Sequence, residues 1–579
     1  MAAFLNVESS LTGRLWTGPS PQADRLAEAM MQATRLPLAL CHSLVARNVA
    51  PDQAQAYLAP ALRDLMPDPR HLRDMEVAAA RFLAAVAARQ RIAIFADYDV
   101  DGGASAALLI TWLRGLGQTA TLYIPDRIDE GYGPNVPAMA ALGAAHDLIL
   151  CVDCGTLSHE PIAAAVCDVV VLDHHLGGEV LPPAIAVVNP NRQDEDGALG
   201  HLCAAAVVFL MLVEANRQLR GVGRTGPDLM AMLDLVALAT VADVAPLIGV
   251  NRAFVRQGLR VMARRERPGL RALADVAKLD TAPTAYALGF VLGPRINAGG
   301  RIGQADLGAR LLATDNPIEA SKLAERLHTL NAERREIEAA VRAEALAQVE
   351  ARGDTGPLAW AAAEGWHPGV VGIVAARMKE ATGRPSVVIG FEGTVGKGSG
   401  RSVEGVDLGA AIHLLAAEGL IEKGGGHRMA AGLSLSRGQL APAMARLAAL
   451  LARQTTALPS RAALRLDALL MPSAATTALV EEIDSAGPFG ASSPAPRFCF
   501  ANQQVTSRPM GTGHLRLQFG DASAKLEAVL FNAHDTPLGA AFLNPGHHRF
   551  HLAGRLEVNS WGGRSRVQLR LEDAAVANR

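Results

Sequence analysis

The sequence lacks a strong net charge of either sign. Its 579 residues contain 55 Lys and Arg against 57 Asp and Glu, which gives a formal net charge of -2 at pH 7. This balance excludes a histone-like protein that coats nucleic acid through bulk charge. It does not exclude a nucleic-acid site, because such a site depends on basic groups that cluster on one face. Any such site must therefore be local.

Lysine is scarce, so arginine carries nearly all of the positive charge. Arginine presents a planar fork that suits phosphate, but a compositional bias of the genome explains an excess of arginine and alanine as well. Only individual arginines can therefore support a functional argument. The lysines are Lys278, Lys322, Lys379, Lys397, Lys423 and Lys525.

The sequence also lacks a disulfide framework. Its six cysteines lie in apolar surroundings at irregular spacing, which fits a reducing compartment. Cys151 and Cys154 form a C-x-x-C pair, but residues three apart on a strand point to opposite faces of a sheet. Zinc binding or redox chemistry at this pair is therefore disfavoured.

Long hydrophobic runs are missing too. The N-terminus has no basic region followed by an apolar core, and the most apolar stretch, residues 202–213, is too short to cross a bilayer. We therefore expect a soluble, cytoplasmic protein.

The length is enough for roughly four domains of about 150 residues. From Arg91, short β-rich runs alternate with Ala/Leu-rich helical ones, which is typical of a parallel sheet covered on both faces. We expect a multidomain α/β protein that ends in a small antiparallel barrel. Its predicted segments are a helical leader that packs on the core formed by the next segments (1–80), a doubly wound domain (81–255), a helical connector that ends in a long charged helix (256–354), a second α/β domain (355–457) and the barrel (458–579).

Acidic and imidazole groups come directly after three of the predicted strands in the first α/β domain. In an open parallel sheet the carboxyl ends of the strands face one crevice, so these side chains should converge. A further carboxylate lies in an apolar helical run. The residues are Asp97, Asp99 and Asp101 in FADYDVDGG, Asp153 in CVDCGT, Asp173, His174 and His175 in LDHHLGG, and Asp243 in ALATVADVAPL.

Several carboxylates packed together are unfavourable unless a cation neutralises them. Carboxylate oxygen and imidazole nitrogen suit Mn²⁺ or Mg²⁺ better than structural zinc. Four to six such ligands favour two ions that share a carboxylate, the usual arrangement for phosphoester hydrolysis. A calcium EF-hand is excluded because Leu108 occupies the position of its Glu. Taken alone, each group has an ordinary structural explanation. The His pair could cap a helix, and Asp243 could pair with a core arginine.

The motifs FADYDVDGG, CVDCG, LDHH, ALATVADV and GPRINAGGRIG resemble, in this order, those of the DHH phosphoesterase superfamily and, within it, the RecJ single-strand-specific exonucleases. WHPGVVGIVAARM, KGSGRS and GGGHRMAAGL resemble the DHH-associated domain, and GPFGASSPAPRF resembles the entry to an OB-fold. The resemblance covers about residues 35–579. It implies that the three predicted globular segments are a DHH domain, a DHH-associated domain and an OB-fold.

The resemblance also assigns the metal ligands. Asp153 would bridge the two divalent ions, and His175 would lie close to the leaving group. Phe95 stands where many relatives carry a histidine, which leaves a ligand position that Asp97 could fill. The implied metal set is Asp97, Asp99, Asp101, Asp153, His174, His175 and Asp243.

Further residues match motifs that hold the strand in RecJ-like enzymes. Arg295 and Arg301 match phosphate or transition-state contacts that Asn297 supports, and Ser399, Arg401 and Ser402 match a pocket for a 5′-phosphate end. A Gly-rich turn and an arginine fork suit phosphate, although the P-loop spacing is absent. The stretch IPDRIDEGYG adds Arg127 as a phosphate contact and Tyr132, either a base-stacking platform or an ordinary surface aromatic; His427 is either structural or in contact with the strand.

The resemblance implies a metal-dependent 5′→3′ exodeoxyribonuclease, a hydrolase that acts on ester bonds of single-stranded DNA in DNA repair and recombination and releases 5′-mononucleotides. A helicase and a single-strand-binding protein are the partners it suggests, and the expected state is a monomer. The alternatives are a DHH phosphodiesterase that acts on short oligonucleotides, cyclic dinucleotides or nucleotide 3′-phosphates, and a catalytically inactive DNA-binding scaffold. The OB-like tail favours a polymeric substrate, and the intact acidic motifs argue against the scaffold.

Overall fold

The computed structural model describes residues 3–127, 130–353, 355–455, 462–521, 524–534, 536–561 and 564–577. They form two compact units, each made of separate stretches of the chain. One unit comprises residues 1–66, 246–256 and 459–579, and the other comprises residues 67–245 and 257–458. We describe each unit by itself.

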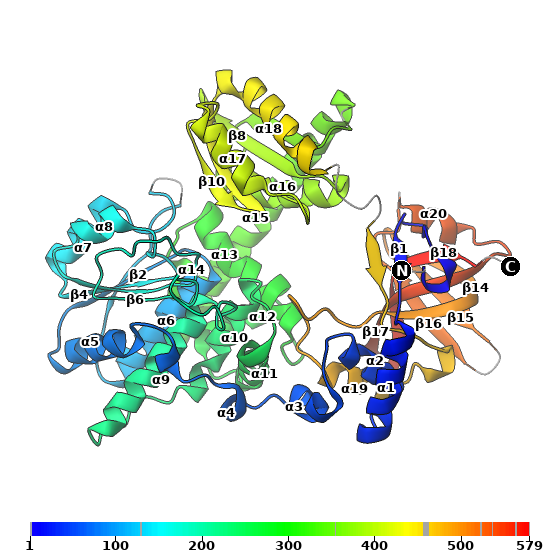
Figure 1. Ribbon diagram of the computed structural model, residues 1–579, viewed down its shortest axis with the longest axis horizontal. Coiled ribbons are helices and arrows are strands. Elements are labelled where there is room, and N and C mark those ends of the chain that lie inside the picture. The colour runs from blue at the N-terminus through cyan, green and yellow to red at the C-terminus, as the bar shows by residue number, and fades with distance from the viewer. Residues whose placement is uncertain are drawn as a thin grey trace. The chain divides into compact units, whose positions relative to one another are not determined.

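The second unit begins with a five-stranded, wholly parallel sheet in the order β3-β2-β4-β5-β6. Figure 1 shows α7 and α8 on one face of this sheet and α5, α6 and α9 on the other. The doubly wound arrangement expected from the alternating pattern is therefore present. The elements are α5 (Met75–Ala87), β2 (Ile92–Ala96), α6 (Val100–Gly115), β3 (Thr121–Tyr123), α7 (Val136–Ala145), β4 (Leu148–Val152), α8 (His159–Ala164), β5 (Asp168–Leu172), β6 (Ala186–Val188), α9 (Ala204–Gly221) and α10 (Leu233–Ala242).

The apolar strands explain why this sheet lies in the core. Every residue of β2 and β4 is buried, as expected for parallel strands that are covered on both faces. Their carboxyl ends share one edge of the sheet, where the polar residues begin.

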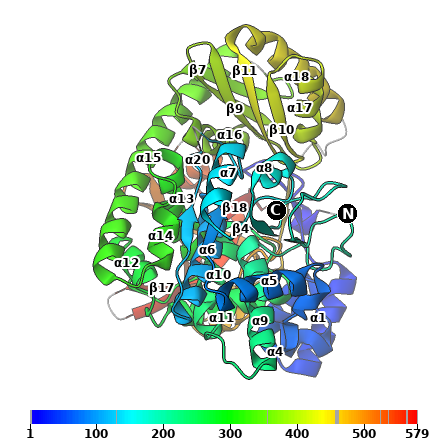
Figure 2. The same cartoon turned by 90° about the vertical axis from the view of Figure 1, so that its left-hand side faces the viewer.

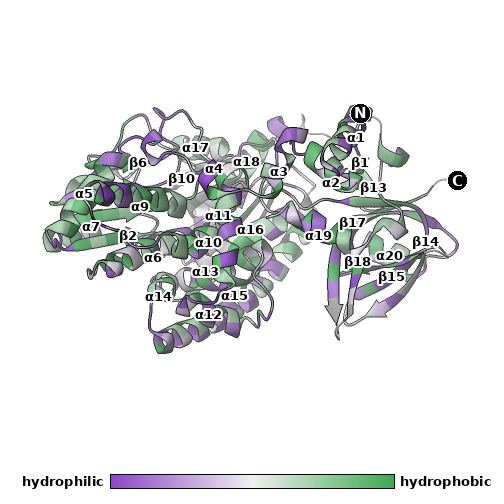
Figure 3. Cartoon of the chain, turned by 90° about the horizontal axis from the view of Figure 1, so that it is seen from below, coloured by the Kyte–Doolittle hydropathy of each residue, from purple (hydrophilic) through white to green (hydrophobic). Residues whose placement is uncertain are grey.

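A helical region comes next and ends in the predicted long helix, α15. Figure 3 shows that α15 carries both hydrophilic and hydrophobic residues along its length. Its buried residues recur at helical spacing, as at Leu323, Leu327 and Leu330. The elements are α11 (Gly249–Met262), whose residues up to Arg256 belong to the first unit, α12 (Pro268–Val276), the π-helix η5 (Ala287–Leu292), α13 (Gly293–Ile302), α14 (Leu307–Ala313) and α15 (Pro317–Arg352).

The second sheet of this unit has the order β10-β11-β9-β8-β7, in which only the pair β7 and β8 is parallel. Val388 on β8 packs toward α16, whereas its neighbours Val387 and Ile389 pack toward α17 and α18, as strand alternation requires. Figure 2 shows these helices on opposite sides of the sheet. The elements are β7 (Ala359–Glu364), α16 (Pro368–Thr382), β8 (Ser386–Glu392), β9 (Val395–Arg401), α17 (Leu408–Ala417), β10 (Lys423–His427), β11 (Ala430–Ser436) and α18 (Leu440–Thr455).

The first unit contains the predicted C-terminal barrel. Strands β14, β15, β16, β18 and β17 pair in that order, and antiparallel pairing of β14 with β17 closes the barrel. Phe498, Phe500 and Phe542 lie fully buried inside it. Its elements are β12 (Ala463–Arg465), β13 (Ala468–Leu469), α19 (Thr477–Ser485), β14 (Phe498–Met510), β15 (His514–Gly520), β16 (Lys525–Leu530), α20 (Pro537–Leu543), β17 (Arg549–Trp561) and β18 (Arg564–Val576).

The N-terminal residues pack with this barrel. Strand β1 pairs with β12 in parallel, and the buried Trp16 Nε1 donates a hydrogen bond to Asp573 Oδ2 at 2.9 Å. Residues 1–66 thus belong to the same compact unit as residues 459–579, and the expectation that the leader packs on the core stays a prediction. The elements are β1 (Leu15–Thr17), α1 (Pro21–Thr34), α2 (Leu38–Val45), α3 (Ala54–Leu58) and α4 (Leu62–Leu65).

Short 3₁₀ helices complete the described elements: η1 (Phe4–Asn6), η2 (Pro51–Gln53), η3 (Pro69–His71), η4 (Met230–Met232), η6 (Arg437–Gln439) and η7 (Pro472–Ala474). None of the described helices is both long and apolar enough to cross a bilayer. The exact domain boundaries expected from the sequence stay a prediction.

Candidate active site

Three carboxylates lie at one edge of the parallel sheet. Asp97 comes after β2, Asp153 after β4 and Asp173 after β5, and these strands are neighbours in the sheet. All three residues are almost fully buried, with exposed fractions of 3%, 2% and 1%. The convergence that the sequence predicts at the strand ends is therefore seen.

Asp99 and Asp101 begin the helix after β2. Asp99 is the N-cap of α6, and its Oδ1 accepts hydrogen bonds from Asp101 N at 2.8 Å and Gly102 N at 3.1 Å. Asp101 accepts from Ala204 N at 2.7 Å and Ala205 N at 2.8 Å, which are first-turn donors of α9. A carboxylate at a helix N-terminus satisfies free N–H groups and complements the helix dipole.

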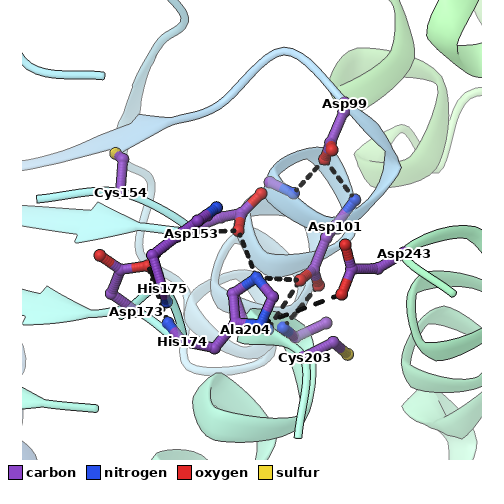
Figure 4. A network of polar contacts seen from close by, with 12 residues as sticks. Asp99, Asp101, Asp153, Cys154, Asp173, His174, His175, Cys203, Ala204 and Asp243 are labelled. Atoms are coloured by element: carbon purple, nitrogen blue, oxygen red, sulfur yellow. Dashed lines mark hydrogen bonds and ion pairs between the residues drawn. The ribbon is translucent and has the colours of Figure 1, made fainter. Parts of the chain in front are cut away.

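His174 lies at the centre of the acidic cluster, as Figure 4 shows. Its Nε2 is 3.3 Å from Asp153 Oδ1 and 3.7 Å from Asp101 Oδ2, and its Nδ1 is 3.9 Å from Asp243 Oδ2. Asp243 is the C-cap of α10, so its carboxylate lies where this apolar helix ends. Side chains from four different segments thus meet around one imidazole.

His175 is held by the carboxylate that precedes the histidine pair. Its Nδ1 lies 2.8 Å from Asp173 Oδ1, and the Tyr132 hydroxyl lies 3.1 Å from the ring. Burial acts to lower the pKa of His175, but the hydrogen bond and the charge of Asp173 outweigh it and raise that pKa to about 9. Burial also acts to raise the pKa of Asp173, yet the hydrogen bonds from His175 and Thr156 hold it below its usual range.

Other carboxylates of the cluster have raised pKa values, in contrast to Asp173. Burial, and then the charges of neighbouring carboxylates, hold the pKa values of Asp97 and Asp153 well above their usual range and raise that of Asp243 to about 8. Asp97 Oδ1 and Asp153 Oδ1 are buried and accept no hydrogen bond from any described residue. A bound cation would relieve both features, because it neutralises the charge and occupies the open lone pairs.

The donor set fits divalent metals. Within the described residues, three groups bring one ligand atom from each member within 4.8 Å of the others. Oxygen and imidazole nitrogen without thiolate is the chemistry of Mn²⁺ or Mg²⁺. The groups are Asp153, His174 and His175; Asp101, His174 and Asp243; and Asp97, Asp99 and Asp153.

Phe95 is buried in β2 and stacks on Tyr123 with ring centroids 5.3 Å apart, so it offers no ligand atom. Asp97, two residues later, belongs to one of the three groups. That it takes over a ligand position at Phe95 stays a prediction.

Hydrogen bonds from a polar network hold the two histidines, and the sequence did not predict this network. Asn189 is fully buried after β6, and its Nδ2 donates to Thr156 Oγ1 and to His175 O, each at 2.8 Å. Thr156 Oγ1 donates in turn to Asp173 Oδ2 at 2.7 Å, and Asn191 Nδ2 donates to His174 O at 2.6 Å. The signal was the NPN tripeptide at residues 189–191, directly after β6, a strand that was not predicted from the sequence.

Helix α13 joins the acidic cluster to the second sheet. Asn297 Oδ1 accepts a hydrogen bond from Val100 N at 3.0 Å, which ties α13 to the start of α6. Arg301 Nη1 donates to Gly369 O at 3.2 Å, in the first turn of α16. Arg295 points elsewhere, because its guanidinium contacts Val291 O and His328 Nδ1, the latter on α15.

A cluster of arginines lies beside α13 and α16. Arg127 lies over the Tyr98 ring at 5.1 Å, and its charge lowers the pKa of both Arg301 and Arg401. Burial is the larger cause in each case and brings the pKa of Arg301 to about 10. Cations that repel one another next to a helix N-terminus form an anion-binding environment.

Of the residues in the SGRS motif, Ser399 and Arg401 lie in this cluster, whereas Ser402 lies in the protein interior. Arg401 Nη1 donates to Ser399 Oγ at 2.8 Å, and both side chains lie against Gly372 in α16, where an added Cβ would come within 3.0 Å of Arg401 Nη2. Ser402 is fully buried, and its hydroxyl donates to Val406 O at 2.8 Å. His427 is exposed at the end of β10 and accepts from Met429 N at 3.4 Å. The binding roles predicted for these residues stay predictions.

The fold and the site place the chain in one class of proteins, the phosphoesterases. Comparison with known protein families supports the same class. Residues 91–240 match the N-terminal domain of the DHH family, residues 355–453 match the DHHA1 domain, and residues 466–573 match the RecJ OB domain.

The chain belongs to the RecJ family of single-stranded-DNA-specific exonucleases. It is 39% identical over 511 residues to RecJ of Dickeya dadantii, which covers 84% of this chain and 88% of the relative. It is also similar to the crystal structures of Thermus thermophilus RecJ in complex with Mn²⁺ and with Mg²⁺. The Mn²⁺ complex has a TM-score of 0.81 at 29% identity and covers 96% of this chain and 79% of that one. The Mg²⁺ complex has a TM-score of 0.74 at 28% identity and covers 97% and 78%.

Proposed function

We propose that the protein is a 5′→3′ exonuclease that hydrolyses single-stranded DNA with two divalent cations, Mn²⁺ or Mg²⁺, and releases 5′-mononucleotides in DNA repair and recombination. The observation that carries this proposal is the pairing, within one unit, of buried carboxylates that need a cation with arginines that need an anion. Helix α13 contacts the start of α6 through Asn297, which accepts from Val100 N, and the first turn of α16 through Arg301, which donates to Gly369 O. A phosphodiester strand supplies the anion, and metals supply the cations.

The cations would be held by Asp97, Asp99, Asp101, Asp153, His174, His175 and Asp243. When bound, they would polarise the scissile phosphate and lower the pKa of the attacking water. Asp153 belongs to two of the three ligand groups, which fits a bridging role.

The chain's own residues position the reactants. Asp173 holds the Nδ1 side of His175, so the imidazole keeps one orientation next to the cluster. The ring then serves the cluster either as a ligand of a cation or as a contact to the leaving oxygen. Tyr132, a residue that is 53% exposed and whose hydroxyl donates to Asp153 O at 3.0 Å, can stack on a base at the mouth of the site.

The polarity of degradation would come from the arginine cluster. A 5′-terminal phosphate bears an extra charge compared with an internal phosphodiester. Arg401, Ser399 and Arg127, next to the N-terminus of α16, offer the donors and the positive field that such an end requires. Ser402 supports this pocket by fixing the turn after β9, and His427 contacts the strand from β10. Arg295 would contact a phosphate after leaving its carbonyl partner.

The barrel of the other unit would bind the strand outside the site through backbone contacts and stacking, as OB-folds do. Phosphate contacts would dominate, so the affinity should fall steeply with salt. A helicase and a single-strand-binding protein are the proposed partners, the first to supply unpaired strands and the second to present them. We also propose that the protein acts as a cytoplasmic monomer.

The decisive experiment uses single strands labelled at the 5′ or the 3′ end, with Mn²⁺, Mg²⁺ or EDTA. We expect the 5′ label to appear at once as a mononucleotide, the 3′-labelled strand to shorten progressively, and EDTA to stop both. A blunt duplex of the same sequence should survive. Release of the 3′ label first, or cleavage in EDTA, would contradict the proposal.

A further inference from the structure

The loop between β3 and α7 carries two residues of the proposed strand-binding site, Arg127 and Tyr132. Arg127 lies over the Tyr98 ring, in the arginine cluster. The Tyr132 hydroxyl donates to Asp153 O at 3.0 Å, at the acidic cluster. One loop therefore reaches both the proposed 5′-phosphate pocket and the proposed metal site, so its described residues set the spacing between them.

Glu130 closes a turn within this loop. Its Oε1 accepts a hydrogen bond from Asp126 N at 2.9 Å, and its own backbone N–H donates to Asp126 O at 2.8 Å. Gly131 N donates to the same carbonyl at 3.0 Å. Arg127 follows Asp126 directly, so the bonds to Glu130 fix the backbone from which its side chain extends.

The other oxygen of Glu130 binds both ends of the loop. Oε2 accepts from the Tyr123 hydroxyl at 2.6 Å and from Asn135 Nδ2 at 3.0 Å. Tyr123 is the last residue of β3, and Asn135 is the N-cap of α7. Burial and then the bond to Glu130 raise the pKa of Tyr123 to about 12, so the hydroxyl remains a donor at neutral pH. One carboxylate thus connects a strand end, a turn and a helix start, and bonds to a charged acceptor are the stronger kind.

Packing leaves a gap on this side of the loop. Glu130 is exposed, and it lines a surface hollow of about 560 Å³ together with residues of β3 and α7. The glycines on either side of Tyr132, Gly131 and Gly133, have φ values of 88° and 74°, and glycine restricts the backbone least of all residues. The position of Tyr132 relative to Arg127 therefore depends on the hydrogen bonds to Glu130.

We propose that Glu130 is a positioning residue for the DNA strand. Its carboxylate fixes the spacing between Arg127, at the 5′ end of the substrate, and Tyr132, at the mouth of the site. In this role Glu130 touches neither the substrate nor a cation and acts only through these two residues of its loop. The inference rests on the proposed exonuclease function.

The test compares hydrolysis, in Mn²⁺, of matched single strands that carry a 5′-phosphate or a 5′-hydroxyl. Glu130→Ala removes all three acceptor contacts. We expect the preference for the 5′-phosphate, measured as the ratio of the two kcat/KM values, to fall about tenfold, because Arg127 is no longer held. Glu130→Gln keeps one acceptor oxygen and should lose less. Glu160→Ala removes an exposed carboxylate on α8 and should keep the wild-type preference.

Double-mutant cycles distinguish positioning from a general loss of stability. The preference for the 5′-phosphate measures the contact of Arg127, and kcat/KM on 5′-hydroxyl strands measures the contact of Tyr132. Glu130→Ala should lower the first quantity in the wild type but change it by less than about twofold in Arg127→Ala. It should lower the second quantity in the wild type but change it by less than about twofold in Tyr132→Ala. Residues that act independently would give additive losses.

Thermal unfolding with and without Mn²⁺ checks that each variant is folded and binds metal. An unchanged 5′-phosphate preference in folded Glu130→Ala would overturn the inference, and so would additive losses in either cycle. A failure of the proposed function would be seen differently, because the wild-type protein itself would then degrade no single strands or show no preference for a 5′-phosphate.

Discussion

At the scale of single residues, the backbone of Asp153 explains how its carboxylate reaches the centre of the site. Its φ of 60° is in the left-handed region, which turns the chain sharply where β4 ends. Asp and Asn occupy this region more readily than other residues with a side chain. The turn directs Asp153 toward His174 rather than along the strand.

Asp153→Asn is the variant that tests this carboxylate most cleanly. Asparagine keeps the size and tolerates the left-handed backbone, so the fold should persist. We expect hydrolysis of single-stranded DNA in Mn²⁺ to fall by at least about a hundredfold, because the bridging charge is lost. Steady-state assays of the variant, with the exposed Asp280→Asn as control, measure this. Activity close to that of the control would exclude the bridging role.

The raised pKa of Asp243, about 8, predicts how stability depends on pH without metal. The native carboxyl binds a proton up to that pKa, whereas the unfolded one loses it near its usual value. The free energy of unfolding should therefore fall as the pH rises from about 4 to 8. Mn²⁺ replaces the proton, so its stabilising effect should grow over the same window.

Thermal unfolding at pH 5, 6.5 and 8, each in EDTA and in Mn²⁺, measures this effect. We expect the rise in Tm on adding Mn²⁺ to be largest at pH 8. Asp243→Asn should make the stability of the metal-free protein less dependent on pH. A rise in Tm that is equal at all three pH values would contradict the prediction.

At the scale of elements, the turn after β5 is held by the turn after β6. Asn189 contacts both Thr156 and the His175 carbonyl, so the position of the histidines depends on a neighbouring strand. Outer hydrogen bonds of this kind orient metal ligands.

Asn189→Asp replaces two buried donors with acceptors at constant size. We expect metal affinity to fall by about 10- to 100-fold and stability to fall by about 1–3 kcal/mol, because Thr156 and the His175 carbonyl lose a partner. Gln193→Glu makes the same change on an exposed side chain of the next loop and should have little effect. Mn²⁺ titration monitored by calorimetry checks both. Unchanged metal affinity in Asn189→Asp would show that the network serves the fold alone.

Strand β9 carries Arg401 and, four residues earlier on the same face, Lys397. Arg401 is half-buried beside Arg127 and α16, whereas Lys397 is exposed. We expect Arg401→Gln to slow degradation of 5′-phosphorylated strands about tenfold more than that of 5′-hydroxyl strands, because it loses a charge-assisted contact to the end. Lys397→Gln should affect both substrates equally. Equal slowing of both substrates by Arg401→Gln would refute the end pocket.

At the scale of the whole molecule, the features that could be predicted are those that follow from the local pattern of apolar and polar residues. The apolar strands and the polar residues at their ends result from alternation along the chain, so the convergence of Asp97, Asp153 and Asp173 could be predicted. The long helix α15 could be predicted from its charged periodicity in the same way.

The features that could not be predicted depend on contacts between distant segments. Nothing local in LWT indicates that β1, at residues 15–17, pairs with β12, at residues 463–465. Arg295 contacts His328, and the Ser402 hydroxyl is buried. Both features depend on tertiary packing, which cannot be deduced from a sequence motif.

The division into two units predicts that each can be weakened separately. Trp16 donates to the fully buried Asp573 in one unit, and Trp366 Nε1 donates to Glu344 Oε2 at 2.9 Å in the other. Trp16→Phe leaves a buried carboxylate oxygen without its donor and should destabilise its own unit by about 1–3 kcal/mol. Trp366→Phe is the matched change in the unit that contains the cluster of carboxylates and histidines.

Calorimetry of the full-length protein, with and without Mn²⁺, distinguishes the unfolding transitions of the two units. Mn²⁺ should shift only the transition that Trp366→Phe lowers, because ligand binding stabilises the part that binds. Trp16→Phe should lower the other transition and weaken binding of long single strands, while short oligonucleotides are still cut. If Trp16→Phe instead lowers the transition that Mn²⁺ raises, the units unfold together, and the strand-binding and hydrolytic parts are not energetically separate.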